Sequence, residues 1–472
     1  MTNRIPTGDR PEGLRVGSVS ATHLVFFVIA AAAPLTVLTG LTPLQFLVGG
    51  RTVPAGFLMA GAVYMVFAVG FTAMSRHIRN TGAFFAYITH GLGSRVGAGS
   101  AFVAYTSYTM GQIGFCAVAG LFATTTLRLL AGIELHWAVS ALVIGFFVSV
   151  VSYLRVDAGA RLLAVLLLAE VGILLVLMAS ILLQGVPEGY SFTSFDPGTW
   201  SFSSIGPLLV VTFIVFIGFE QTAVYSEEVT DPARTVPRAT YTAVALLAAI
   251  YTVCSWLILM AAGPSALMAK LSTDPQNFVF MISSIYVGRA VTDVMMVLIV
   301  TSFTAGVLAL HNASARYLFS LGRSGILPKG LSTTASTGSP TVAVTVQTVI
   351  VLGAITAFGM SALDPYTQVV VWTNTPTLLG VLALQVLTCL AVIGYFRRDH
   401  RGESVWHRIV APTVSAIAIA IVMLLVCTQL HLLTMLGPMG NILISMPLIV
   451  AFLIGALRSP GVGREVLLND QL

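Results

Sequence analysis

The chain has 472 residues, of which 57% are hydrophobic and only 9% are charged, and its formal net charge is +5. A soluble domain carries roughly 25% charged residues, so a chain this apolar could not cover its own surface in water, and lipid must surround it. The basic residues are scattered over short segments without a dense patch, which argues against a nucleic-acid partner.

Long apolar stretches follow one another along the chain, and each has the roughly 20 residues that a helix needs to cross a bilayer. They lie at 21–41, 54–74, 97–127, 136–154, 158–184, 204–226, 239–262, 278–312, 341–358, 366–395, 409–429 and 435–457. The sequence therefore predicts an all-α integral membrane protein with twelve transmembrane helices. The longest connections, 185–203 and 313–340, are expected to be ordered loops.

The positions of lysine and arginine predict the orientation of these helices, because cytoplasmic loops carry an excess of basic residues. With twelve helices, Arg51, Arg128, Lys270 and Arg289 fall on one side, and the other 19 of the 23 basic residues fall on the opposite side. This bias favours an inner or plasma membrane protein with cytoplasmic termini, formed by residues 1–20 and 458–472.

No motif in the sequence indicates enzymatic chemistry or a cofactor. A P-loop, a zinc-protease motif and a nucleophile elbow are all absent from the sequence. Cys116, Cys254, Cys389 and Cys427 lie within apolar stretches without metal-ligand spacing, and are interpreted as packing residues. We therefore expect neither an enzyme nor a metal site.

Two of the apolar stretches carry residues that interrupt a helix near its middle. In the first stretch, Pro34 follows a run of alanines, and proline removes a backbone donor and clashes with the preceding turn. In the sixth, Gly218 lowers helix propensity and Glu220 places an acid in an apolar run. A simple proline kink is the alternative at Pro34.

The two breaks occupy the first position in each of two five-helix blocks, 21–184 and 204–395, with a further helix pair at 409–457. Interrupted helices at matching places in two halves are typical of inverted-repeat transporters, whose substrate site lies near the bilayer midplane. Because five is odd, the two blocks would enter the membrane from opposite sides.

Three motifs resemble the amino acid permeases of the amino acid–polyamine–organocation superfamily. The first is Gly218-Phe219-Glu220 with SEEVTDPARTVPRA at 226–239. The second runs from Ala315 to Lys329 and is followed by Pro340, which opens the next helix. The third joins the second and third helices over 75–87. This resemblance implies a LeuT-type 5+5 inverted repeat plus two C-terminal helices, which carries an amino acid or related amine.

The resemblance also implies a substrate site between helices 1, 3, 6, 8 and 10, where backbone groups at the breaks hold the substrate. A half-helix N-terminus presents free N–H groups to a carboxylate. The candidate substrate-binding residues are Ala31, Ala32, Ala33, Pro34, Tyr108, Gln112, Ile214, Phe216, Gly218 and Trp372. Packing is the alternative role for Tyr108, Gln112 and Trp372.

The sequence departs from the family pattern in three places. The usual Gly-x-Gly of the first helix is replaced by Ala32-Ala33-Pro34, which removes one N–H from the carboxylate site. Ile214 stands where an aromatic gate residue is common, and Glu170 stands where proton-coupled members carry a lysine.

Glu170 and Glu220 are the candidate proton-coupling residues. A carboxyl group in a low-dielectric site favours its neutral form and ionises when water reaches it, which suits a carrier that alternates between two sides. Ser302 and Thr304 are expected to face Glu170. The alternative for Glu170 is a permanently protonated acid that bonds to a neighbouring helix.

At the cytoplasmic mouth, Glu227, Glu228, Arg234 and Arg238 are predicted to form a gating or structural ion-pair network. The function that the sequence favours is secondary active transport of an amino acid, with proton symport as its mechanism. Alternatives are a polyamine or amine importer, an amino acid exchanger and, more distantly, a non-transporting sensor or scaffold. The expected partners are a small amino acid or amine, a proton and the lipid bilayer.

Overall fold

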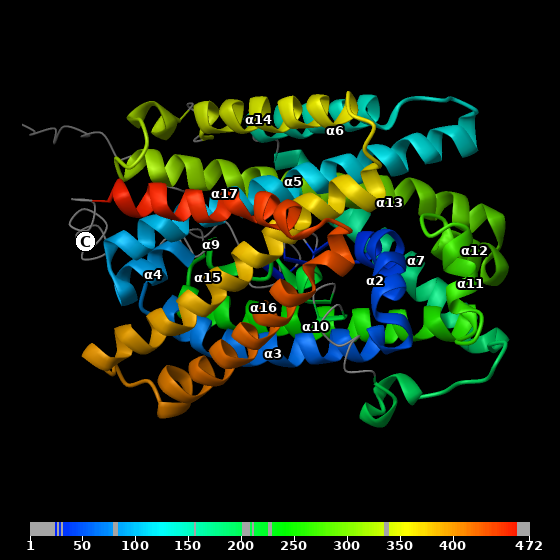
Figure 1. Ribbon diagram of the computed structural model, residues 1–472, viewed down its shortest axis with the longest axis horizontal. Coiled ribbons are helices and arrows are strands. Elements are labelled where there is room, and N and C mark those ends of the chain that lie inside the picture. Colours follow the sequence, from blue (N-terminus) through cyan, green and yellow to red (C-terminus); the bar gives the residue numbers. More distant parts are fainter. Residues whose placement is uncertain are drawn as a thin grey trace, which may run out of the picture.

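The computed structural model describes residues 24–25, 28–29, 32–78, 84–154, 157–200, 208–209, 212–224, 229–334 and 339–459, without the side chains of 157–164, 221 and 224. Within these ranges every regular element is a helix. The long helices run side by side along the long axis of the molecule (Figure 1). The prediction of an all-α integral membrane protein is confirmed.

The elements with ordinary α-helical geometry vary widely in length. The long ones are α3 (Val53–Ser75), α5 (Ser94–Ala131), α6 (Trp137–Leu154), α7 (Asp157–Gln184), α10 (Pro232–Ala262), α13 (Gly288–Arg323), α14 (Thr341–Gly359), α15 (Val370–Arg398), α16 (Ala411–Thr434) and α17 (Pro438–Leu457). The short ones are α2 (Thr42–Gly49), α4 (Phe84–Leu92), α9 (Gln221–Val224), α11 (Leu267–Thr273) and α12 (Phe278–Tyr286).

Several helical turns have π or 3-10 geometry instead. The π-helical turns are η1 (Thr36–Leu41), η7 (Pro365–Val369) and η8 (Trp406–Val410). The 3-10 turns are η2 (Gly50–Thr52), η3 (Thr193–Phe195), η4 (Pro197–Thr199), η5 (Ile214–Phe216) and η6 (Lys329–Ser332). Of these, η1 and η5 adjoin the two predicted breaks.

Ten stretches of the described chain are long and apolar enough to cross a membrane. One of them, Thr36–Ser75, runs from the end of the first predicted helix through the second. The predicted helices at 21–41 and 204–226 each lie partly outside the described residues. The number twelve and the inverted repeat therefore stay predictions.

The single helix predicted over 278–312 is wrong in its bounds. The structure divides it into α12 and α13, because Gly288 adopts a left-handed φ of 79° between them. The second part continues to Arg323, so that it also takes up the beginning of the loop predicted at 313–340.

Small residues let the long helices approach one another closely. A side-chain carbon at Gly61 of α3 would meet Ala248 of α10, and one at Gly455 of α17 would meet the backbone of Ala98 in α5. Close backbone approach is the usual way in which helices associate in lipid, where apolar burial provides little drive. The resulting α3–α10 and α5–α17 contacts are among the most extensive in the molecule.

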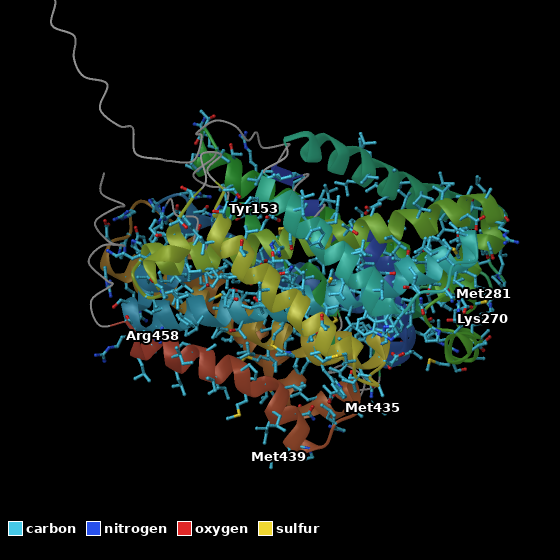
Figure 2. The ribbon with its side chains drawn as sticks, turned by 90° about the horizontal axis from the view of Figure 1, so that it is seen from above. Tyr153, Lys270, Met281, Met435, Met439 and Arg458 are labelled. Atoms are coloured by element: carbon cyan, nitrogen blue, oxygen red, sulfur yellow. The ribbon has the colours of Figure 1, made fainter. Side chains whose placement is uncertain are left out.

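Basic residues lie at both ends of the long axis, as Figure 2 shows. Arg458, just after α17, lies at one end, and Lys270 of α11 lies at the other, near Met281 of α12. This placement agrees with the sequence-based assignment of Arg458 and Lys270 to opposite sides of the membrane.

Candidate functional site

The first predicted break is present at Ala33, whose φ of 44° is left-handed although the residue is not glycine. Helical geometry resumes at Pro34 and continues as the π-helical turn η1. Ala32 and Ala33 are both buried, whereas Ala31 lies outside the described residues. The irregular backbone therefore lies inside the protein, where freed polar groups can be satisfied.

The second break is present at Gly218, whose φ of 118° only glycine adopts readily. It follows η5, which includes Ile214 and Phe216, and precedes α9. The Glu220 carboxylate lies directly over this break: one oxygen accepts the N–H of Gly218 at 2.9 Å, and the other accepts the hydroxyl of Tyr108 at 2.6 Å. Glu220 thus satisfies a backbone donor that the broken helix leaves free.

Each break also exposes a carbonyl, and a tyrosine from a neighbouring helix caps it. Tyr251 of α10 donates to the carbonyl of Ala32 at 3.0 Å, and Tyr64 of α3 donates to the carbonyl of Phe213 at 3.2 Å. Both tyrosines are fully buried. The ring of Phe216 lies between them, 5.3 Å from Tyr64 and 5.6 Å from Tyr251 by ring centroids. The two breaks are therefore joined through one aromatic cluster.

Glu170 lies in α7 with only 3% of its surface exposed, and Ser302 of α13 donates to its carboxylate at 2.7 Å. The predicted contact with Ser302 is present, but Thr304 bonds instead to the carbonyl of Val300. Residues two positions apart point about 200° apart around a helix, so the two hydroxyls cannot both face the same acid.

Tyr108 and Gln112, two of the candidate substrate-binding residues, are both buried in α5. Tyr108 reaches Glu220, and its ring lies 5.7 Å from that of Tyr317 in α13. The Gln112 amide bonds instead to His311 of α13 and to Gln347 of α14, both at 2.8 Å. Gln112 therefore belongs to a polar network that joins three helices.

The remaining aromatic candidate, Trp372 of α15, donates its indole N–H to the carbonyl of Thr434 at 2.9 Å. Thr434 is the last residue of α16. The structure therefore connects Trp372 with the C-terminal helices, and does not bring it to either break.

The ion-pair network predicted at the cytoplasmic mouth stays a prediction, because its two acids lie outside the described residues. Arg234 lies 3.9 Å from Asp231, with both side chains exposed, and Arg238 is exposed. Glu227 and Glu228 lie outside the described residues. One exposed pair three residues apart contributes little by itself.

A tighter cluster, which the sequence did not reveal, surrounds Glu403 in the connection before η8. Its carboxylate, with 8% of the side chain exposed, lies 3.0 Å from the Arg76 guanidinium and 3.4 Å from each of the His77 and His407 rings. Arg76 donates to both carboxylate oxygens. The cluster ties the end of α3 to the connection between α15 and α16.

Comparison with known proteins agrees with this architecture. The sequence model of the amino acid permease family matches residues 18–457. An uncharacterized transporter of Mycobacterium tuberculosis is 26% identical over 318 residues, which cover 62% of this chain and 64% of that protein. The methylthioribose transporter of Bacillus subtilis is 26% identical over 303 residues, which cover 59% and 61% of the two chains.

The chain thus aligns with slightly less than two thirds of these relatives. A third relative, an uncharacterized transporter of Legionella pneumophila, is 29% identical over 182 residues and 38% of each chain.

Proposed function

This chain belongs to the amino acid permease family, and from that premise we propose that it carries an amino acid across the membrane in symport with a proton. The chain is a multi-pass membrane transporter with a small-molecule substrate, as its family and the relatives named as transporters indicate. The substrate, the proton and the direction of transport belong to the proposal.

The observation that carries the proposal is the meeting of two broken helices beside a buried acid. The backbone turns sharply at Ala33 and Gly218, and Glu220 holds the Gly218 N–H and the Tyr108 hydroxyl, so a substrate at this place would exchange with the side chains that now bond to the breaks. Interrupted helices near the midplane are the sites at which transporters bind substrate and coupling ions. We place the substrate against the residues of the two breaks and the turns beside them, which are Ala32, Ala33, Pro34, Ile214, Phe216 and Gly218. Tyr108, which bonds to Glu220, would also contact it.

Glu170 is the proposed site of the coupling proton. It is the buried acid of α7, and its described partner is the Ser302 hydroxyl rather than a cation. A neutral carboxyl group is stable in that position, while an ionised one needs water or a positive partner. A motion that opens α7 from α13 towards either side would let water reach Glu170, and the proton would leave there.

Glu220 is the second candidate for the coupling proton. Its two oxygens already hold the Gly218 N–H and the Tyr108 hydroxyl. The Glu220 carboxylate, the Gly218 N–H and the Tyr108 hydroxyl therefore form one hydrogen-bonded group at the break, and a substrate bound there would change the surroundings of Glu220. Protonation of Glu220 would weaken its acceptor bonds and so change the break itself.

Purified protein in liposomes tests the function. Vesicles with an acidic exterior and an alkaline interior should accumulate a labelled amino acid, and a protonophore should abolish the accumulation. A panel of zwitterionic amino acids, cationic amino acids and polyamines identifies the class, and preloaded vesicles separate symport from exchange. Binding of substrate without flux under any gradient would indicate a sensor or scaffold and would refute the proposal.

A neutral substrate is a second candidate, because Pro34 occupies the first break. Proline has no backbone N–H, so this break offers one donor fewer to a carboxylate. The relative from Bacillus subtilis is named for methylthioribose, a neutral thiosugar without carboxylate or amine. Methylthioribose therefore belongs in the same panel, and uptake of it without amino acid competition would favour this candidate.

We propose that the membrane is the plasma or inner membrane, with both termini in the cytoplasm. The supporting observation is the excess of basic residues on one side in the sequence. Cysteine-accessibility labelling of intact cells, with Thr52→Cys on the outer side and Ser404→Cys on the inner side, tests this orientation. Reaction of the second variant alone with a membrane-impermeant reagent would contradict it.

A further inference from the structure

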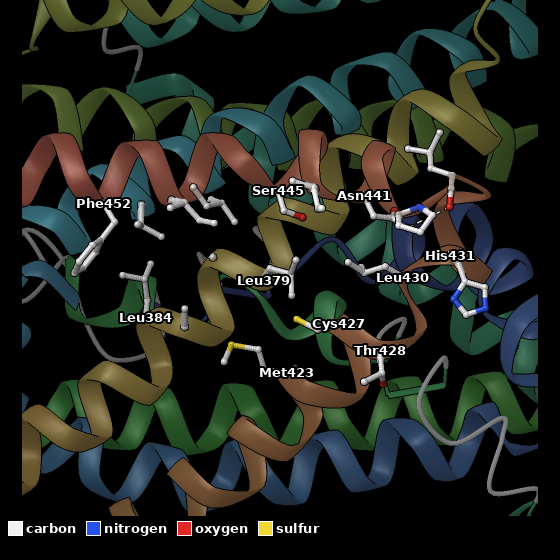
Figure 3. Close-up of a pocket in the computed structure, with 18 of the residues that line it drawn as sticks. Leu379, Leu384, Met423, Cys427, Thr428, Leu430, His431, Asn441, Ser445 and Phe452 are labelled. Atoms are coloured by element: carbon white, nitrogen blue, oxygen red, sulfur yellow. Dashed lines mark hydrogen bonds between the residues drawn. The ribbon is translucent and has the colours of Figure 1, made fainter.

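A groove of about 990 Å³ lies between α15, α16 and α17 (Figure 3). In this region α16 packs along α15 while α17 packs along α5, and α16 and α17 contact each other little. The helix geometry of α16 is interrupted at Gln429, with φ −119° and ψ 16°. Gly380 and Ala383 of α15 line the groove with minimal side chains.

The lining of the groove changes along its length. Figure 3 shows Leu384 and Phe452 at one end, and Thr428, His431 and Asn441 towards the other. Most of the remaining lining residues are leucine, isoleucine or methionine. An occupant that matches this order has a long apolar part and a polar end.

The rim of the groove continues into the apolar surface of the two last helices. Leu424 of α16 is 64% exposed, and Ile442 and Ile449 of α17 are 60% and 63% exposed. In a membrane transporter, such residues on spanning helices face lipid. The groove therefore opens to the bilayer, and hydrocarbon rather than water is available to fill it.

The length of the groove suits the acyl chain of a phospholipid. Residues 438–453 of α17 span roughly 23 Å at 1.5 Å per residue. One leaflet contributes about half of the roughly 30 Å hydrocarbon core of a bilayer, so an extended acyl chain fits along the groove.

We propose that this groove is a binding site for one membrane phospholipid. Its acyl chain lies along Gly380 and Ala383, towards Phe452, and its phosphodiester lies near Thr428 and His431, whose N–H group can donate to it. The contact between Trp372 and Thr434 holds the polar end of the groove together. The site is separate from the substrate site proposed above and does not depend on the transported molecule.

Cys427 provides a reporter for this site. It lines the groove and is exposed, whereas Cys116, Cys254 and Cys389 are buried. The full-length protein is labelled at Cys427 with a small fluorophore and reconstituted into vesicles with increasing fractions of brominated phosphatidylglycerol, then of brominated phosphatidylcholine. A resident lipid gives quenching that rises steeply and saturates at a small fraction of brominated lipid.

The matched control carries the fluorophore one turn away, in Leu424→Cys combined with Cys427→Ser. There, quenching should rise in proportion to the fraction of brominated lipid, as for lipid that exchanges freely. Proportional quenching at both positions would overturn the proposal. Cross-linking of two chains through Cys427, together with weak quenching, would assign the groove to a second copy and would also overturn it.

Native mass spectrometry in mild detergent provides the second measurement. Wild-type protein should retain one phospholipid, and Ala383→Phe, which fills the floor of the groove, should lose it. Val414→Phe places the same side chain on the exposed surface of α16, outside the groove, and should retain the lipid. Equal retention by Ala383→Phe and the wild type, with both proteins folded, would refute the site.

Discussion

The hydroxyl of Tyr251 in α10 donates a hydrogen bond to the carbonyl of Ala32, at the break of the first helix. The reciprocal bond joins Tyr64 of α3 to the carbonyl of Phe213, at the other break. Each tyrosine therefore belongs to the helix that follows one break and caps the other. In a 5+5 inverted repeat, helices two and seven are equivalent, so this exchange of caps supports the proposed repeat.

Removal of one cap should disturb the site more than the fold. Tyr251→Phe leaves the Ala32 carbonyl buried without its partner, which costs about 1–3 kcal/mol. Because that carbonyl adjoins the proposed substrate, we expect KM to rise several-fold with a smaller change in the maximal rate. Initial rates of uptake into liposomes over a range of substrate concentrations measure both quantities.

Tyr190→Phe is the matched control, because the Tyr190 hydroxyl donates to the Ile181 carbonyl, far from either break in the sequence. It should leave KM unchanged. Tyr64→Phe should resemble Tyr251→Phe if both caps position the same site. Equal effects of the Tyr190 and Tyr251 substitutions would show that the caps serve stability alone.

Neutralisation of Glu170 should separate coupling from movement of substrate. Glu170→Gln keeps the size of the side chain and an acceptor for Ser302 but cannot carry a proton. We therefore expect loss of accumulation driven by a pH gradient, with exchange between preloaded and external substrate retained. Ser302→Ala should leave the coupling in place and change only its pH dependence. Undiminished pH-driven accumulation by Glu170→Gln would exclude Glu170 as the proton carrier.

The backbone at Gly218 should not tolerate a side chain. Its φ of 118° lies where residues other than glycine are strained, and such strain costs of order 1–3 kcal/mol. Gly218→Ala should therefore lower the unfolding temperature and the rate of uptake together. Gly353→Ala is the control, since that glycine lies in α14 with open space around it, and alanine there should be neutral or stabilising. A fully active Gly218→Ala would contradict the proposed role of this break.

The Glu403 cluster should contribute to stability at the end of α3. Glu403→Gln removes the charge that faces Arg76, His77 and His407, and a hydrogen bond to a charged group contributes about 1.5–3 kcal/mol. The expected result is a lower unfolding temperature in detergent, measured by intrinsic fluorescence. Asp399→Asn alters an exposed pair with Arg401 and should have little effect. Equal unfolding temperatures for the two variants would argue against a structural role for Glu403.

Much of the fold could be predicted from hydropathy, because each helix that crosses a bilayer must itself carry about 20 apolar residues. The predicted helices at 54–74, 341–358 and 366–395 differ from α3, α14 and α15 by a few residues at their ends. The breaks beside Pro34 and at Gly218 could also be predicted, since proline and glycine change backbone geometry wherever they occur in a helix.

The partners of the polar side chains were decided by the tertiary structure. Nothing local to Gln347 or Glu403 indicates that the first bonds to Gln112 or that the second lies beside Arg76, because the paired residues are 235 and 327 positions apart. The periodicity of a helix determines which residues share a face, as with Tyr108 and Gln112, but not which helix lies opposite. The sequence by itself therefore determined a membrane protein with two interrupted helices, and helix packing decided which groups meet at the breaks.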